Sequence, residues 1–205
     1  MGAFALSRIA PLRPRPPDGS PRVDENDLVR RAIDGQVWAQ SELFKQYAPG
    51  ILALLTRLLS SHADAEDSTQ DTFVIAFRDL RQLREPAAFP GWLRQIAVHQ
   101  AQHRIRRRKV LAIFSLDGAQ DAPLDELADP GAPPEERAEL ALLNRLLQQL
   151  PAADRTAWML RYVEGYELTE VAELCGCSLA TAKRRIAAAR ERISRHLEIK
   201  EGSDE

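Results

Sequence analysis

The stretch LTEVAELCGCSLATAKRRIAAARERI, residues 168–193, has the pattern of a helix-turn-helix. Thr169 is placed to cap the first helix, and the small side chain of Ala172 allows two helices to cross closely. At Gly176 a turn can adopt a positive φ at low cost, and Ser178 is placed to cap a second helix. The stretch therefore predicts two helices joined by a tight turn.

The second helix of this motif is predicted to carry a basic outer face. Its expected inner positions are Leu179, Ala182 and Ile186. The outer positions that can reach base edges or phosphates are Ser178, Thr181, Lys183, Arg184 and Arg185. Arginine suits guanine and lysine suits phosphate, so we expect this face to bind duplex DNA in the major groove. A basic, solvated helical hairpin is the alternative, and several classes of DNA-binding protein carry the same motif.

The charges of the chain are segregated along the sequence. A formal net charge of −2 over 205 residues would by itself argue against a nucleic-acid partner. Arginine and lysine nevertheless crowd residues 104–109 and 183–195. Acid is concentrated between these segments, at Asp117, Asp121, Asp125, Glu126, Asp129, Glu135 and Glu136. Segregation of this kind can produce two basic faces on a chain that is nearly neutral overall.

The composition is that of an ordinary globular protein, with 44% hydrophobic and 28% charged residues. Aromatic residues are few, at 6%, which favours helices over sheets. No apolar run approaches the roughly 20 residues needed to cross a bilayer, and the N-terminus lacks the order of a signal peptide. The two cysteines, Cys175 and Cys177, cannot form a disulfide framework, so we expect a reducing cytoplasm.

The pattern along the chain predicts an all-α protein with two small helical domains. Pro-rich residues 1–23 are expected to be a disordered basic arm, and residues 24–112 the first domain. Residues 113–134, rich in proline, glycine and acid, have the composition of a flexible linker. Residues 135–199 are expected to form the second domain, and residues 200–205 a disordered tail.

Within the first domain the apolar residues recur with helical spacing. One helix is predicted over residues 62–83, with an inner stripe at Phe73, Ala76, Phe77, Leu80 and Leu83. Asp67, Gln70, Asp71 and Val74 lie opposite that stripe. The residue pairs Glu85-Pro86 and Pro90-Gly91 mark a broken loop, and a final helix is expected from about Trp92 into the arginine cluster.

Three segments resemble the extracytoplasmic-function (ECF) subfamily of sigma-70 type RNA polymerase sigma factors. DAEDSTQDTFVIAF, residues 64–77, resembles the region 2.2 signature, and AFPGWLRQIAVHQAQHRIRRRK, residues 88–109, resembles regions 2.3 and 2.4. LQQLPAADRTAWMLRYVEGYELTEVAELCGCSLATAKRRIAAARERI, residues 147–193, resembles region 4. Both domains match in the order and separation of the family, and the resemblance covers nearly everything between residues 28 and 197.

The resemblance implies that the helix at residues 62–83 binds core RNA polymerase. Its outer residues Asp67, Gln70, Asp71 and Val74 would grip the clamp helices of the large subunit. The alternative is a solvated face at the acidic start of a helix, stabilised by the helix dipole.

The resemblance also implies that the first domain binds and melts the minus-ten promoter element. The implied DNA-binding residues are Arg84, Glu85, Pro86, Ala87, Ala88, Trp92, His99, His103, Arg104, Arg106, Arg107 and Arg108. The loop 84–88 would capture a flipped base, and the arginines would follow the phosphates of the melted non-template strand. Phe89 and Trp92 resemble the aromatic landmarks of this element, and for both we favour packing in the core.

The chain contains a pair of histidines and a pair of cysteines that resemble metal or redox sites, but we expect neither function. His99 and His103 depart from the asparagine and the acidic or amide residue that the family often carries, which puts the minus-ten preference in doubt. No third ligand accompanies these histidines, so we expect no metal site and no cofactor. Cys175 and Cys177 flank the turn where the motif buries apolar side chains, and we interpret them as packing residues.

The sequence as a whole predicts a sigma factor and not an enzyme. Core RNA polymerase, duplex and melted promoter DNA, and an anti-sigma factor are the expected partners, with the second domain on the minus-thirty-five element. By family analogy the acidic linker threads toward the RNA exit path. The alternative is a helix-turn-helix regulator that does not join the polymerase, which leaves the helix at residues 62–83 without a purpose. A polymerase-binding adaptor without promoter choice is a third reading, and no nucleophile elbow or phosphate loop supports an enzyme.

Overall fold

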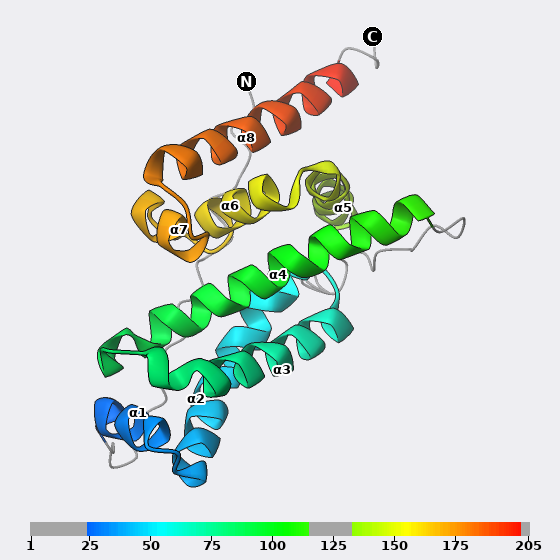
Figure 1. Cartoon of the computed structure of the whole chain (residues 1–205). Coiled ribbons are helices and arrows are strands. Elements are labelled where there is room, and N and C mark those ends of the chain that lie inside the picture. The colour runs from blue at the N-terminus through cyan, green and yellow to red at the C-terminus, as the bar shows by residue number, and fades with distance from the viewer. Residues whose placement is uncertain (1–23, 115–132, 202–205) are drawn as a thin grey trace. The chain divides into compact units, whose positions relative to one another are not determined.

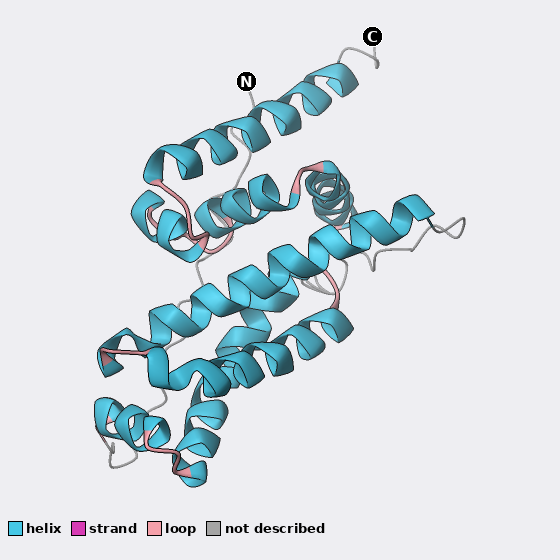
Figure 2. Ribbon diagram, in the orientation of Figure 1, coloured by secondary structure: helices cyan, strands magenta, loops and turns pink. Residues whose placement is uncertain are grey.

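The computed structural model describes residues 24–114 and 133–201, and all elements in these ranges are helices (Figure 2). The predicted arm at residues 1–23 and most of the predicted linker and tail lie outside the described residues. The chain divides into two compact units, the first ending at Arg104 and the second beginning at Ile105. Within the described ranges, no helix combines the length and the apolar character needed to cross a membrane.

The first unit is built on two long helices that pack against each other, α2 (Val37–Leu59) and α3 (His62–Asp79). Before them comes α1 (Glu25–Ile33), and after them come the short turns η2 (Leu80–Gln82) and η3 (Pro86–Ala88). The long helix α4 (Phe89–Phe114) follows and runs beside α3 (Figure 1). The buried core of the first unit contains Leu28, Val29, Leu43, Ile51, Leu55, Leu58, Phe73, Leu80, Phe89, Leu93 and Val98.

Local chemistry explains where these helices begin and end. The Asp24 side chain accepts a hydrogen bond from the Asn26 amide and caps α1. Ser61 caps α3 by accepting from the Asp64 amide, while Ser60 ends α2 in the left-handed region at φ +54°. The periodicity predicted one helix over residues 62–83; in the structure the α-helix ends at Asp79 and continues as the 3₁₀ turn η2.

The second unit contains α5 (Pro134–Gln149), α6 (Ala152–Tyr162), α7 (Leu168–Leu174) and α8 (Leu179–Glu201). The long helix α8 packs against the other three (Figure 1). The residues that close this core are Leu146, Leu147, Leu150, Trp158, Leu160, Val171, Ala182, Ile186, Ala189 and Ile193. The inner positions of α8 recur every three or four residues, as a helix with one buried face requires.

Two expectations for the helix-turn-helix are wrong. Thr169 does not cap α7, because Glu167 is the N-cap and forms a reciprocal capping box with Glu170. Leu179 is exposed and not an inner position. It is the first residue of α8, and this end of the helix lies outside the buried core of the second unit. Gly176 occupies the turn with φ +59°, as predicted.

Candidate nucleic-acid and protein-binding surfaces

One face of α3 is exposed along its length, and the opposite face is buried. Asp67, Gln70, Asp71 and Val74 all lie on the exposed face, as the helical spacing predicted. Val74 is an apolar member of this face, with an exposed fraction of 66%. We name these four residues the α3 outer face. The four side chains are therefore accessible to a partner protein.

The buried face of α3 uses small polar residues that sequence analysis did not single out. Ser68, Thr69 and Thr72 are buried beside Phe73 and Ala76. The Thr69 hydroxyl donates to the Ala65 carbonyl at 2.7 Å, and the Thr72 hydroxyl donates to the Ser68 carbonyl at 2.6 Å. These bonds satisfy the hydroxyl donors inside the helix, so the groups can be buried at low cost. Their spacing of three or four residues was the signal available in the sequence.

The predicted base-capture loop is exposed, and the aromatic residue after it is not. Arg84, Glu85, Ala87 and Ala88 are exposed, Pro86 is half-buried, and η3 shapes the loop. Phe89 is fully buried, in line with the preference for core packing, and Trp92 is half-buried at a ring distance of 6.3 Å from it. The loop can therefore present its backbone and short side chains to a ligand while Phe89 anchors it.

Tyr47 packs against Phe89, the buried residue that anchors the loop. Its ring packs edge-on against Phe89 with centroids 5.4 Å apart, and its hydroxyl donates a hydrogen bond to the Glu25 carboxylate. Burial, together with Glu25, raises the pKa of the Tyr47 hydroxyl well above its usual range. Since α1 contacts η3, this arrangement ties three segments of the chain together at the loop. Sequence analysis placed no such role on Tyr47.

The residues of α4 predicted to bind DNA differ in their surroundings. His99, His103, Arg106 and Arg107 are exposed, and Arg108 is half-buried. Arg104 differs because its guanidinium is held by two carboxylates of α3. The exposed group is the one able to follow a phosphate backbone without first breaking an internal ion pair.

In the helix-turn-helix, the predicted DNA-facing residues lie on the surface of α8. Lys183 and Arg184 are exposed, and Thr181 and Arg185 are half-buried. Ser178 caps α8, since its hydroxyl accepts from the Thr181 amide at 3.2 Å and bonds the Thr181 hydroxyl at 2.9 Å. The cap fixes the first turn of the helix, which is the turn that enters a groove in this motif.

Cys175 is buried between the two helices of the motif, whereas Cys177 is half-buried. Burial raises the pKa of the Cys175 thiol to about 12, and the neighbouring Cys177 contributes further. The thiol therefore stays protonated at neutral pH and behaves as a small apolar group, which agrees with the packing interpretation.

We expect N-ethylmaleimide to modify Cys177 well before Cys175 in the folded chain at pH 7.5. Only the thiolate reacts, and Cys175 is both shielded and protonated. Timed labelling followed by peptide mass analysis would measure the two rates. The same chain in denaturant is the control, where both cysteines should be modified. Equal rates in the folded chain would contradict the buried placement of Cys175.

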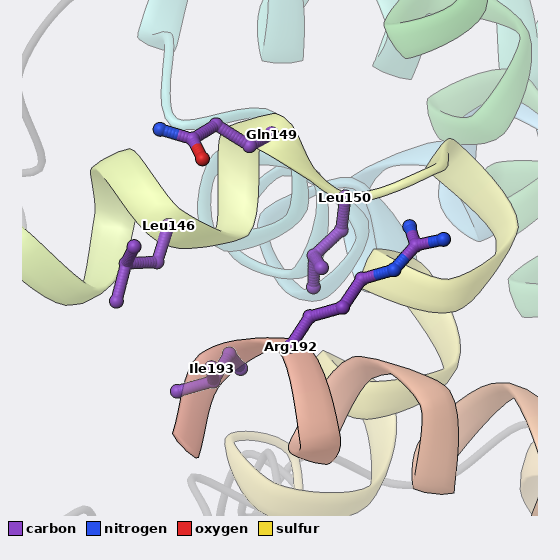
Figure 3. Close-up of a pocket in the computed structure, with 5 residues that line it drawn as sticks. All are labelled: Leu146, Gln149, Leu150, Arg192 and Ile193. Atoms are coloured by element: carbon purple, nitrogen blue, oxygen red, sulfur yellow. The ribbon is translucent and has the colours of Figure 1, made fainter. Parts of the chain in front are cut away.

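A small pocket of about 140 Å³ opens between α5 and α8, lined by Leu146, Gln149, Leu150, Arg192 and Ile193 (Figure 3). Its volume is below that of usual small-molecule sites. None of the predicted site residues lines it. The candidate binding surfaces are therefore exposed helix faces and a loop, which is the form that sites for DNA and protein partners usually take.

The fold is that of a two-unit helical protein whose second unit carries a helix-turn-helix, the fold class of many DNA-binding proteins. Comparison with known proteins specifies the class. The family model Sigma-70 region 2 matches residues 43–110, and Sigma-70 region 4 matches residues 140–202.

Two sigma factors match over nearly their whole length. The RNA polymerase sigma-H factor of Pseudomonas aeruginosa is 33% identical over 85% of this chain and 94% of the relative. The ECF RNA polymerase sigma-E factor of Haemophilus influenzae is 29% identical over 86% of this chain and 97% of the relative. The chain therefore belongs to the ECF subfamily of sigma-70 type RNA polymerase sigma factors.

Solved structures show the same fold. The sigma factor RpoE of Bartonella quintana, in complex with the anti-sigma factor NepR, matches with a TM-score of 0.57 and 24% identity. That match covers 78% of this chain and 96% of RpoE. CnrH, in complex with the cytosolic domain of CnrY, matches with a TM-score of 0.55 and 23% identity, over 85% of this chain and 97% of CnrH.

Proposed function

We propose that this chain binds core RNA polymerase and directs it to promoters with a minus-thirty-five and a minus-ten element. Residues 24–112 form the domain that docks on the polymerase and opens DNA, and residues 135–199 form the domain that binds duplex DNA. The chain acts by binding, in the bacterial cytoplasm, with no catalytic step of its own. Membership of the sigma-70 family supports this assignment.

The observation that carries the proposal is the α3 outer face. A regulator that binds DNA through a helix-turn-helix alone has no use for an exposed valine between Gln70, Asp71 and Asp67. An interface of this composition gains free energy from burying Val74 and specificity from the polar groups around it. We propose that the clamp helices of the polymerase large subunit cover it.

Melting at the minus-ten element is assigned to the loop 84–88 and α4. The loop is exposed and anchored by Phe89, so its backbone can surround a base that has left the stack. Trp92 follows the loop and is half-buried, so we propose that it contacts the flipped nucleobase. Arg106, Arg107 and Arg108 then guide the phosphates, and His99 and His103 contact bases.

The minus-thirty-five element is assigned to the outer face of α8, through Ser178, Thr181, Lys183, Arg184 and Arg185. Four of these residues are placed in the first two turns of the helix, after the Ser178 cap. We propose that this end of α8 enters the major groove. An anti-sigma factor that covers the same faces would block both assignments, as the partners of RpoE and CnrH suggest.

We expect Arg184→Ala to weaken promoter binding by the holoenzyme by about 1–3 kcal/mol, because it removes one base or phosphate contact. The loss should appear only on promoters with a minus-thirty-five element. Arg190→Ala, also exposed and six residues further along α8, is the matched control and should have little effect. Filter binding of the two holoenzymes to promoters with and without the element measures the difference. Equal losses at both positions would indicate non-specific electrostatics.

Transcription in vitro with core RNA polymerase and fragmented genomic DNA tests the proposed function. We expect discrete start sites that share one promoter motif. These starts should disappear with Gln70→Ala and Asp71→Ala together, while promoter-independent DNA binding by the chain persists. DNA binding without any polymerase-dependent initiation would overturn the proposal and favour a regulator that does not join the polymerase.

A further inference from the structure

Arg104 joins two surfaces that the sequence assigns to different partners. Its Nε and Nη2 atoms donate to Oδ1 of Asp64 at 2.9 and 2.7 Å, and Nη2 also donates to Oδ2 of Asp67 at 2.7 Å. Arg104 belongs to α4, the DNA-binding helix, whereas Asp67 belongs to the α3 outer face. The three side chains form a cluster between helices that are separated by about forty residues of sequence.

The cluster is partly withdrawn from water. The exposed fraction of the side chain is 24% for Arg104 and 15% for Asp64, but 64% for Asp67. Both guanidinium donors converge on the single oxygen Oδ1 of Asp64, so the pair is a charge-assisted contact with a partly buried carboxylate. Removing the arginine would take an ion-pair partner from Asp64 in a poorly solvated position, which is costly.

This geometry makes Arg104 a poor phosphate ligand. Its formal positive charge faces two carboxylates, which already bind the guanidinium. Binding a phosphate would require Arg104 to leave both partners or would place the phosphate close to Asp64 and Asp67. Arg106 and Arg107, two and three residues further along α4, are exposed and can contact phosphate without that cost.

The same geometry suits Arg104 to a different role. The carboxylate of Asp67 is largely exposed, yet one of its oxygens is fixed by Nη2 of Arg104. A side chain that is already held in place loses less conformational entropy when a partner binds it. A free aspartate at this position would have to be ordered by the polymerase itself.

Resting on the proposed function, we propose that Arg104 is a positioning residue for polymerase docking and not a contact to promoter phosphates. It orients Asp67 on the α3 outer face and ties α3 to α4. The polymerase-docking surface therefore includes, through Arg104, a residue of the DNA-binding helix.

Two measurements on the full chain separate this role from a DNA contact. The first is the Kd for core RNA polymerase, and the second is the salt dependence of promoter binding by the holoenzyme. Arg104→Gln should raise the Kd for core polymerase by about 5- to 10-fold and leave the salt slope of promoter binding unchanged. Arg106→Gln should leave the Kd for core polymerase unchanged and flatten the salt slope by roughly 0.7–0.9, the effect of one lost phosphate contact.

A double-mutant cycle tests whether Arg104 acts through Asp67. With Asp67→Asn in place, Arg104→Gln should add less than 2-fold to the Kd for core polymerase, because the residue that it positions is already altered. Arg104→Lys, which keeps a cation within reach of one carboxylate, should restore part of the affinity. Thermal unfolding of each variant identifies a general loss of folding. If Arg104→Gln does not fold, the Kd of Arg104→Lys for core polymerase, with and without Asp67→Asn, serves as the test.

A flattened salt slope for Arg104→Gln, with an unchanged Kd for core polymerase, would overturn the inference and return Arg104 to the DNA-binding residues. Additive effects of Asp67→Asn and Arg104→Gln on the Kd would also overturn it. Failure of the proposed function itself would be recognised separately, because the unsubstituted chain would then not bind core polymerase.

Discussion

Val74→Asp is expected to raise the Kd for core RNA polymerase by about 30-fold or more, which corresponds to roughly 2 kcal/mol. Val74 is 66% exposed at the C-terminal end of the α3 outer face, so the free chain loses little stability when it is replaced. In the complex, the new carboxylate would be buried without a partner beside Asp71 and Asp67, and both desolvation and like-charge repulsion would oppose docking.

Val37→Asp is the matched control for this prediction. Val37 is also an exposed valine of the first unit, with an exposed fraction of 73%, but it lies at the start of α2 and outside the α3 outer face. Titration of labelled chain with core polymerase should give a Kd for Val37→Asp within 2-fold of the unsubstituted chain. An equal loss for both variants would indicate a general effect of charge and would contradict the docking face.

Phe89→Ala is expected to lower the free energy of unfolding of the first unit by about 3–5 kcal/mol. The ring is fully buried and packs edge-on against Tyr47, so its removal leaves a cavity beneath the loop 84–88. Small domains have only about 5–15 kcal/mol of stability in total, so the variant is expected to be partly unfolded at 37 °C. Urea denaturation of the full chain, followed by circular dichroism, measures the change.

Phe44→Ala deletes the same atoms from a ring that also makes an edge-on contact, in this case with Phe73 at 4.7 Å. Phe44 is 41% exposed, so its loss should cost roughly 1–2 kcal/mol. If the two variants were equally destabilised, burial at Phe89 would not be the source of the effect, and the loop would have to be anchored by other residues.

The sequence predicted the helices and their inner faces well, because burial on a helix repeats every three or four residues. Phe73, Ala76 and Leu80 of α3, and Ala182 and Ile186 of α8, are buried as predicted. The periodicity does not locate the ends of helices, where caps decide. Thr169 was therefore taken for a cap that Glu167 provides, and Leu179 for an inner residue.

The apolar periodicity of the sequence does not predict contacts between residues that are far apart in the chain. The ion pairs of Arg104 with Asp64 and Asp67, and the hydrogen bond from Tyr47 to Glu25, join residues on different helices. Nothing in the local spacing of either partner indicates the other, since periodicity describes one helix at a time. The sequence could identify Arg104 as part of a basic cluster, but only the packing of α3 and α4 distinguishes it from Arg106 and Arg107.

The shared cluster of Arg104, Asp64 and Asp67 limits how this protein can be recombined with its relatives. A chimera that exchanges α4 alone, in order to change promoter choice, would inherit a foreign residue opposite Asp64 and could lose its fit to the polymerase. Grafts confined to His99, His103 and the arginines from Arg106 onward avoid that junction. Exchanges in α4 are therefore expected to keep polymerase binding only where positions 64, 67 and 104 are inherited as a single unit.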